Sequence, residues 1–170
     1  AEEPKFRNLY LNQRVAPVST VIAKEDWLAC RGNADWLDGE DVYLALDLSA
    51  KTDLTALVGV TLDGCRVQAW FWKPADLIED HERRDRFPYR QYSADWIEAI
   101  EGRSIHPQAI ALRIAEITAR YNVKGMAYDR WGIDNLLREF DGVGLQAHKD
   151  GEDGDGLRLI PWGQGFKDMS

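Results

Sequence analysis

Three consecutive apolar segments in the first half of the chain constrain its fold more than any other feature of the sequence. Residues 41–49 (DVYLALDLS) form a nearly continuous apolar run, which is typical of a central strand covered on both faces. Residues 54–62 (LTALVGVTL) and 65–72 (CRVQAWFW) predict two more strands, and Asp63-Gly64 between them is typical of a two-residue hairpin turn. We therefore expect one sheet that begins with three strands close together in the chain.

The rest of the chain alternates between helical and strand patterns. Ile110, Ile114 and Ile117 recur at the spacing of an amphipathic helix, and Pro107 stands near its start. Three strands followed by alternating helices and strands predict a mixed α/β sheet with helices on both faces. We expect helices over residues 89–102, 106–121 and 133–140, and strands over residues 123–129 and 157–162.

The chain is long enough for one hydrophobic core, since it has 170 residues of which 45% are hydrophobic. Residues 1–40 are mixed in character and interrupted by prolines, so we expect a linker or arm with one short helix over residues 24–32. Residues 41–170 should form the folded domain. The sequence has no apolar run of 18 residues and no signal-peptide pattern, so we expect no membrane segment and an intracellular protein.

Two aspartates stand at matching positions, because Asp47 and Asp129 each end an apolar strand. If the two strands are parallel neighbours, their ends lie about 4.8 Å apart. Two carboxylates that close repel each other unless a cation lies between them. Taken singly, each aspartate also fits a structural role, Asp47 as a turn residue and Asp129 as a cap of the following helix.

The donor set predicts Mg²⁺ or Mn²⁺, because both ligands are carboxylates and no soft ligand stands near them. Ions of this kind, in pairs about 4 Å apart, assist phosphodiester hydrolysis. Asp53 is a candidate outer carboxylate, and it also fits a turn at the start of a strand. The two cysteines and three histidines lack the spacing of a zinc site.

The basic residues are candidates for contact with DNA. Those near the two aspartates and in the segment HERRDR are Lys51, Arg83, Arg84, Arg86 and Arg130. The charge run also fits a solvated helix face. The net charge of −8 argues against a nucleic-acid partner, although acidic residues that gather metal contribute to that sum.

The motifs together resemble a known family. LALDLSAKTDLTALV, RRDRFPY, MAYDRWG and GQGFKDMS, in this order, are similar to the nuclease domain of the terminase large subunit of tailed bacteriophages, in the HK97-like group. The segment FRNLYLNQ resembles the passage from the packaging ATPase domain into that nuclease.

This resemblance implies an RNase H-like fold and a metal-dependent endonuclease that cuts concatemeric double-stranded DNA. Asp47 matches the first-strand metal ligand of the family, and Asp129 matches the aspartate of its YDRW strand end. The implied partners are the terminase ATPase domain, the small terminase subunit and the portal. The implied location is the cytoplasm of the bacterial host.

The sequence departs from the family in two ways. The third carboxylate of the family follows the GQGF motif by some tens of residues, and this chain ends at Ser170. No P-loop pattern occurs, so we expect no ATPase motor within these 170 residues. We expect an incomplete nuclease domain without its C-terminal part, and weak or absent hydrolysis.

Two other functions remain open. A non-catalytic DNA-binding or scaffold module could keep the fold without the chemistry, and the acidic composition favours it. An actin-like ATPase also begins its first hairpin with an aspartate. Its phosphate-binding turn needs glycine, whereas the turn here reads LSAKTD, which argues against that class.

Overall fold

The computed structural model describes residues 10, 22–49, 53–64, 66–93, 96–130 and 132–163. It divides the chain into two compact units, Ala1–Asn33 and Ala34–Ser170. In the first unit, helix α2 (Lys24–Ala29) lies within the helix predicted over residues 24–32 and has no buried residue. The second unit contains the sheet and the candidate site.

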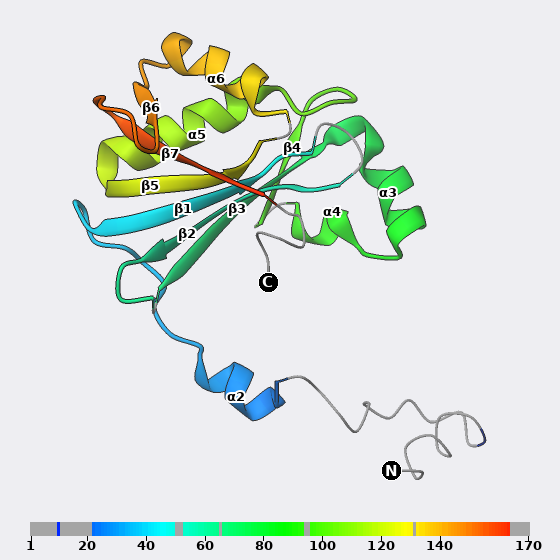
Figure 1. The fold of residues 1–170 in the computed structure, drawn as a ribbon. Coiled ribbons are helices and arrows are strands. Elements are labelled where there is room, and N and C mark those ends of the chain that lie inside the picture. Colours follow the sequence, from blue (N-terminus) through cyan, green and yellow to red (C-terminus); the bar gives the residue numbers. More distant parts are fainter. Residues whose placement is uncertain are drawn as a thin grey trace. The chain divides into compact units, whose positions relative to one another are not determined.

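Across the described residues, one seven-stranded sheet has the order β4-β3-β2-β1-β5-β7-β6 (Figure 1). The first three strands pair antiparallel, β1 with β2 and β2 with β3. The other neighbours are parallel, including β1 with β5, so the predicted mixed sheet is confirmed. The strands are β1 (Asp41–Asp47), β2 (Thr55–Thr61), β3 (Val67–Pro74), β4 (Ile97–Ile100), β5 (Asn122–Asp129), β6 (Ala147–Lys149) and β7 (Leu157–Trp162).

Two long helices cover one face of this sheet. Helix α5 (Pro107–Arg120) and helix α6 (Ile133–Gly142) lie side by side over the same face (Figure 1). Helix α5 confirms the helix predicted over residues 106–121, and its isoleucines at positions 110, 114 and 117 are buried. The stripe that they form faces the sheet, as the spacing requires.

A smaller helical group follows β3. It consists of the 3₁₀ turn η1 (Ala75–Leu77), helix α3 (Ile78–Asp85) and helix α4 (Tyr89–Tyr92). Trp72 belongs to the core under α5 and α6, so the next residue of β3, Lys73, points to the opposite face. There Lys73 contacts side chains of α3 and α4, which places these two helices against the other face of the sheet.

The helix predicted over residues 89–102 is wrong for its second half. Of the described residues in this range, Tyr89–Tyr92 form helix α4, and Ile97–Ile100 form strand β4. The reason is a free edge: β4 pairs with residues 71–74 of β3, which have no other neighbour on that side of the sheet. Backbone hydrogen bonds to this edge outweigh the helical pattern of the local sequence.

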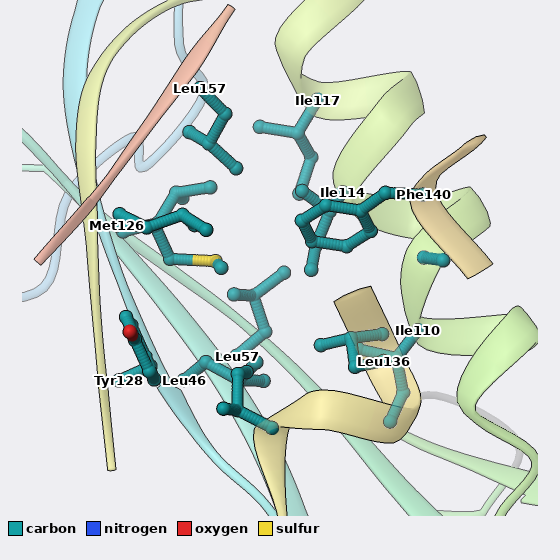
Figure 2. Packing of buried hydrophobic residues seen from close by; sticks show 14 of the residues in the cluster. Leu46, Leu57, Ile110, Ile114, Ile117, Met126, Tyr128, Leu136, Phe140 and Leu157 are labelled. Atoms are coloured by element: carbon teal, nitrogen blue, oxygen red, sulfur yellow. The ribbon is translucent and has the colours of Figure 1, made fainter. Parts of the chain in front are cut away.

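The core lies between the sheet and the two long helices. Leu46, Leu57 and Met126 of the sheet meet Ile114 of α5 and Phe140 of α6 (Figure 2). Each of these side chains is at most 4% exposed. Burial of a large apolar side chain contributes about 1.5–3 kcal/mol, so this layer dominates the stability of the fold.

Trp36 extends the same layer. Its side chain is 3% exposed and packs edge-on against Trp70 and Tyr121, at centroid distances of 5.8 and 5.1 Å. Gly59 of β2 leaves room for the indole, because a Cβ atom there would collide with the ring of Trp36 and with Leu44. The compact unit therefore includes the chain just before β1. Among the described residues, no helix is long and apolar enough to span a bilayer.

Candidate active site

Asp47 and Asp129 end two neighbouring parallel strands. Leu46 of β1 and Tyr128 of β5 are Cα partners, and each aspartate is the next residue of its strand. The two carboxylates therefore leave the sheet at the same edge. The parallel pairing expected from the sequence is confirmed.

Both aspartates also point to the same face of the sheet. Leu46 and Tyr128 are buried under α5 and α6, at 4% and 6% exposure. Because side chains alternate along a strand, Asp47 and Asp129 point to the opposite face. Asp47 is exposed and Asp129 is half-buried.

A bulge in β5 produces this alignment. Val42 pairs with Val123, whereas the next residue, Tyr43, pairs with Gly125, so Lys124 is an extra residue on β5. With a regular ladder from Val42 onward, Asp47 would lie level with Tyr128. The two carboxylates would then be out of step by one position and on opposite faces.

A shallow hollow adjoins the two carboxylates. It has a volume of about 250 Å³, and its walls are formed by residues of β1, β2, β5 and β7. Three of them are alanines, whose side chains are small. The lining includes Asp47, Asp129, Ala45, Ala56, Ala127 and Trp162. A larger hollow of about 680 Å³ runs along β3 and β4 and includes neither aspartate.

The pair of carboxylates fits a hard divalent cation. Mg²⁺ is commonly held by one or two carboxylates while it keeps several of its waters, and an exposed sheet edge leaves room for those waters. Within the described part of the chain, no group of three or more histidine, cysteine, aspartate or glutamate side chains could hold a metal ion. Among the described residues, Asp47 and Asp129 are therefore the two candidate ligands at this edge of the sheet.

Asp53 lies on the loop after β1 and does not line the hollow. Its side chain is 81% exposed, and Oδ1 is 3.8 Å from Nη2 of Arg84. Its backbone N–H donates to Oγ of Ser49 at 3.0 Å. Asp53 is therefore an exposed loop residue whose carboxylate lies near Arg84 of α3.

The arginines of α3 are paired with acidic neighbours. Arg83 lies 2.8 Å from Asp80 and 3.8 Å from Glu79. Arg84 donates two hydrogen bonds to Asp85, at 2.6 and 2.8 Å. These bonds are the main reason that the pKa of Asp85 falls to about 2. The positive charges of Arg83 and Arg84 are therefore largely balanced by acidic residues of the same helix.

The other predicted DNA contacts differ in their surroundings. Arg86 is exposed at the end of α3, where its φ of 54° places it in the left-handed region. Arg130 is exposed and directly follows Asp129. Lys51 lies outside the described residues.

The sequence reasoning missed a buried lysine on β3. Lys73 is fully buried, with Nζ 3.0 Å from Nδ1 of His81 and 4.2 Å from the ring centroid of Tyr89. Tyr89 in turn donates from its hydroxyl to Asp85 at 3.0 Å. Desolvation lowers the pKa of Lys73, against the attraction of Asp85. A lysine near the end of an aromatic strand gives no sequence signal of such burial.

Comparisons with known proteins place the chain as a whole in a family. A family model described as terminase large subunit, endonuclease domain, matches residues 2–170. The chain is similar to the terminase large subunit of Enterobacteria phage HK97, with 38% identity over 171 residues that cover 98% of this chain and 32% of that protein.

The crystal structure of the HK97 bacteriophage large terminase is also similar. It matches with a TM-score of 0.69 and 37% identity, and the match covers 99% of this chain and 34% of that chain. This match supports the RNase H-like fold expected above. The chain spans about a third of the length of the relative that it matches.

Proposed function

Because this chain belongs to the family of terminase large-subunit endonuclease domains, we propose that it supplies two metal ligands of an endonuclease that hydrolyses phosphodiester bonds of double-stranded DNA with Mg²⁺ or Mn²⁺, and that the 170-residue chain alone hydrolyses DNA weakly. Its substrate would be the concatemeric DNA that a tailed phage cuts during packaging. The proposal rests on one observation above all: Asp47 and Asp129 lie level with each other on the same face of the sheet.

Asp47 and Asp129 would hold the metal ion between them. Divalent ions at such a site polarise the phosphate, lower the pKa of a bound water and stabilise the leaving oxygen. A pair of ions is our proposal for the complete site. The second ion needs donors in addition to the two carboxylates that the described residues bring together.

The surface around the carboxylates suits a DNA backbone. The small side chains of Ala45, Ala56 and Ala127 keep the sheet face low beside the acids. Arg130 would contact a phosphate next to the reacting one, since it follows Asp129 and is exposed. Arg86 and Lys51 are further candidates for backbone contacts. Arg83 and Arg84 are weaker ones, because their charges are paired with Asp80 and Asp85.

Partners and location follow from family membership. We propose that the domain works with the terminase ATPase domain, the small terminase subunit and the portal, in the cytoplasm of the infected bacterium. These assignments rest on the resemblance of the chain to the family.

Plasmid nicking in Mn²⁺ tests the catalytic proposal. Asp47→Asn and Asp129→Asn each remove one ligand charge with little change in volume, and each should lower the nicking rate by at least about 100-fold. Asp141→Asn is the matched control, because it removes an exposed carboxylate from the last turn of α6 and should leave the rate unchanged. Nicking that persists in both site variants would contradict the proposal.

A non-catalytic DNA-binding or scaffold module is the second candidate. It is favoured over an enzyme by the finding that the described residues contain no three-ligand cluster, and the net charge of −8 favours a scaffold over a DNA-binding module. Mn²⁺ titration distinguishes the two functions. A scaffold should show no Mn²⁺ binding that disappears in Asp47→Asn, whereas the nuclease should lose binding in that variant.

A further inference from the structure

Thr55 makes two hydrogen bonds to the backbone of Ser49, two residues beyond Asp47. Its Oγ1 accepts from the Ser49 N–H at 2.9 Å and donates to the Ser49 carbonyl oxygen at 2.7 Å. One hydroxyl group thus satisfies both polar groups of a single loop residue. Thr55 is fully buried, so this hydroxyl would be costly to leave without partners.

These bonds stand where the backbone ladder ends. Asp47 and Ala56 form the last Cα pair between β1 and β2, and Thr55 is the residue just before Ala56. Beyond this pair, the side chain of Thr55 makes the hydrogen bonds to the backbone of Ser49. The chain that leaves Asp47 is therefore held on the side of β2.

Thr55 and Asp47 point to opposite faces of the sheet. Thr55 shares its face with Leu57, which belongs to the core under α5 and α6, whereas Asp47 lies on the face with the hollow. Thr55 cannot contact DNA or a metal ion from this position. Any effect that it has on the site must pass through the backbone of residues 47–49.

Asp53, near the start of β2, also contacts Ser49. The Asp53 N–H donates to Oγ of Ser49 at 3.0 Å, and the Asp53 carboxylate lies 3.8 Å from Arg84. Ser49 is thus held through its backbone by Thr55 and holds Asp53 through its side chain. Only the backbone contacts act on the segment that carries Asp47.

We propose that Thr55 is a positioning residue of the metal centre, which keeps the Asp47 carboxylate aligned with Asp129. This inference rests on the proposed function, since it assumes that the two carboxylates hold a divalent ion. A strand end that is free to fray would sample directions in which Asp47 cannot share an ion with Asp129. Groups that orient metal ligands typically affect affinity by about 10–100-fold.

Mn²⁺ binding to the 170-residue chain, measured by calorimetry, tests the inference without any activity assay. Thr55→Val keeps the shape of the side chain and removes the hydroxyl, and it should weaken Mn²⁺ binding by about 10-fold or more. Thr55→Ser keeps the hydroxyl and should bind within about 2-fold of the wild type. This rescue separates the hydrogen bonds from the packing of the methyl group.

Thr61→Val is the control for a general loss of stability. Thr61 lies at the other end of β2, is 2% exposed, and uses its hydroxyl to accept from the N–H of Arg66 at 3.2 Å. The Thr61→Val substitution should lower the unfolding temperature, as Thr55→Val should, and it should leave the Mn²⁺ affinity unchanged. An equal loss of Mn²⁺ affinity in both valine variants would overturn the inference.

Amide hydrogen exchange of the metal-free wild type provides a readout that needs no variant. The Ser49 amide should exchange at least about 10-fold more slowly than the amides of the exposed residues 153–155. Fast exchange at Ser49, or unchanged Mn²⁺ affinity in Thr55→Val, would overturn this inference alone. Absence of Mn²⁺ binding in the wild type would overturn the proposed function and this inference together.

Discussion

Leu46 and Tyr128 are Cα partners in the parallel pairing of β1 with β5, although four residues earlier Val42 is paired with Val123. The extra residue, Lys124, advances β5 by one position. Without it, Asp47 and Asp129 would be out of step by one position and would point to opposite faces of the sheet. The candidate site therefore depends on a bulge at the opposite end of the strand from the carboxylates.

Mn²⁺ should raise the melting temperature of the wild-type chain, because a ligand that binds only the folded state stabilises it. At ten times the dissociation constant the gain is about 1.4 kcal/mol. Asp47→Asn should abolish the shift. In the absence of metal it should melt at or above the wild-type temperature, since repulsion between the carboxylates is relieved. Differential scanning calorimetry with and without Mn²⁺ checks both expectations, and Asp141→Asn should retain the full shift.

The stability of the fold should decrease as the pH falls below about 6.5 through the titration of His81. Burial, followed by the nearby charges of Lys73 and Arg84, lowers the pKa of His81 from its ordinary value of 6.5, while Asp85 and Asp80 oppose this shift. His81 of the unfolded chain therefore binds its proton at a higher pH than His81 of the folded chain. The protein loses stability as the pH falls from the unfolded pKa toward the folded pKa. Asp85 adds its own loss only between pH 3.8 and about 2.

His81→Asn tests this assignment, because the amide oxygen can still accept from Lys73 but does not titrate. Urea unfolding at about pH 7 and about pH 5 should show a smaller difference in the variant than in the wild type. Both values lie above the range in which Asp85 titrates. An unchanged difference would mean that other groups govern the acid response.

Gly59→Ala should destabilise the protein by about 1–3 kcal/mol, because the new methyl group would collide with the indole of Trp36 and with Leu44. Urea unfolding gives the free energy directly. Gly142→Ala is the matched control, since a Cβ atom there meets no other atom within 4 Å and the residue ends a helix. It should be neutral or slightly stabilising. Similar losses in the two variants would indicate that Trp36 does not require a glycine opposite it.

Arg130→Ala should weaken binding of duplex DNA more than Arg83→Ala. Arg130 is exposed beside Asp129, whereas Arg83 is paired with Asp80 and Glu79. Loss of one phosphate contact reduces the slope of log affinity against log salt concentration by about 1. Fluorescence anisotropy over a range of salt concentrations measures both quantities. A larger loss in Arg83→Ala would show that its acidic partners release it when DNA binds.

The elements of the fold were predictable wherever the local pattern was strong. The apolar runs of β1, β2 and β3 and the isoleucine spacing of α5 each report on residues close together in the chain. Strand β4 was not predictable, because it forms by pairing with an edge that exists only after β3 has folded. The burial of Lys73 was hidden for a similar reason, since its partners His81 and Tyr89 come from two later helices.

The candidate site likewise has features that the sequence predicts and features that only the tertiary structure determines. The sequence by itself determined that two carboxylates end apolar strands, because residue type and periodicity are local properties. Only the tertiary structure decided that they share a face, through the extra residue Lys124 in β5, and that Thr55 holds the chain beyond Asp47. Pairing between segments about eighty residues apart depends on how the crossover helix α5 packs on the sheet, and no local pattern records a shift of one residue.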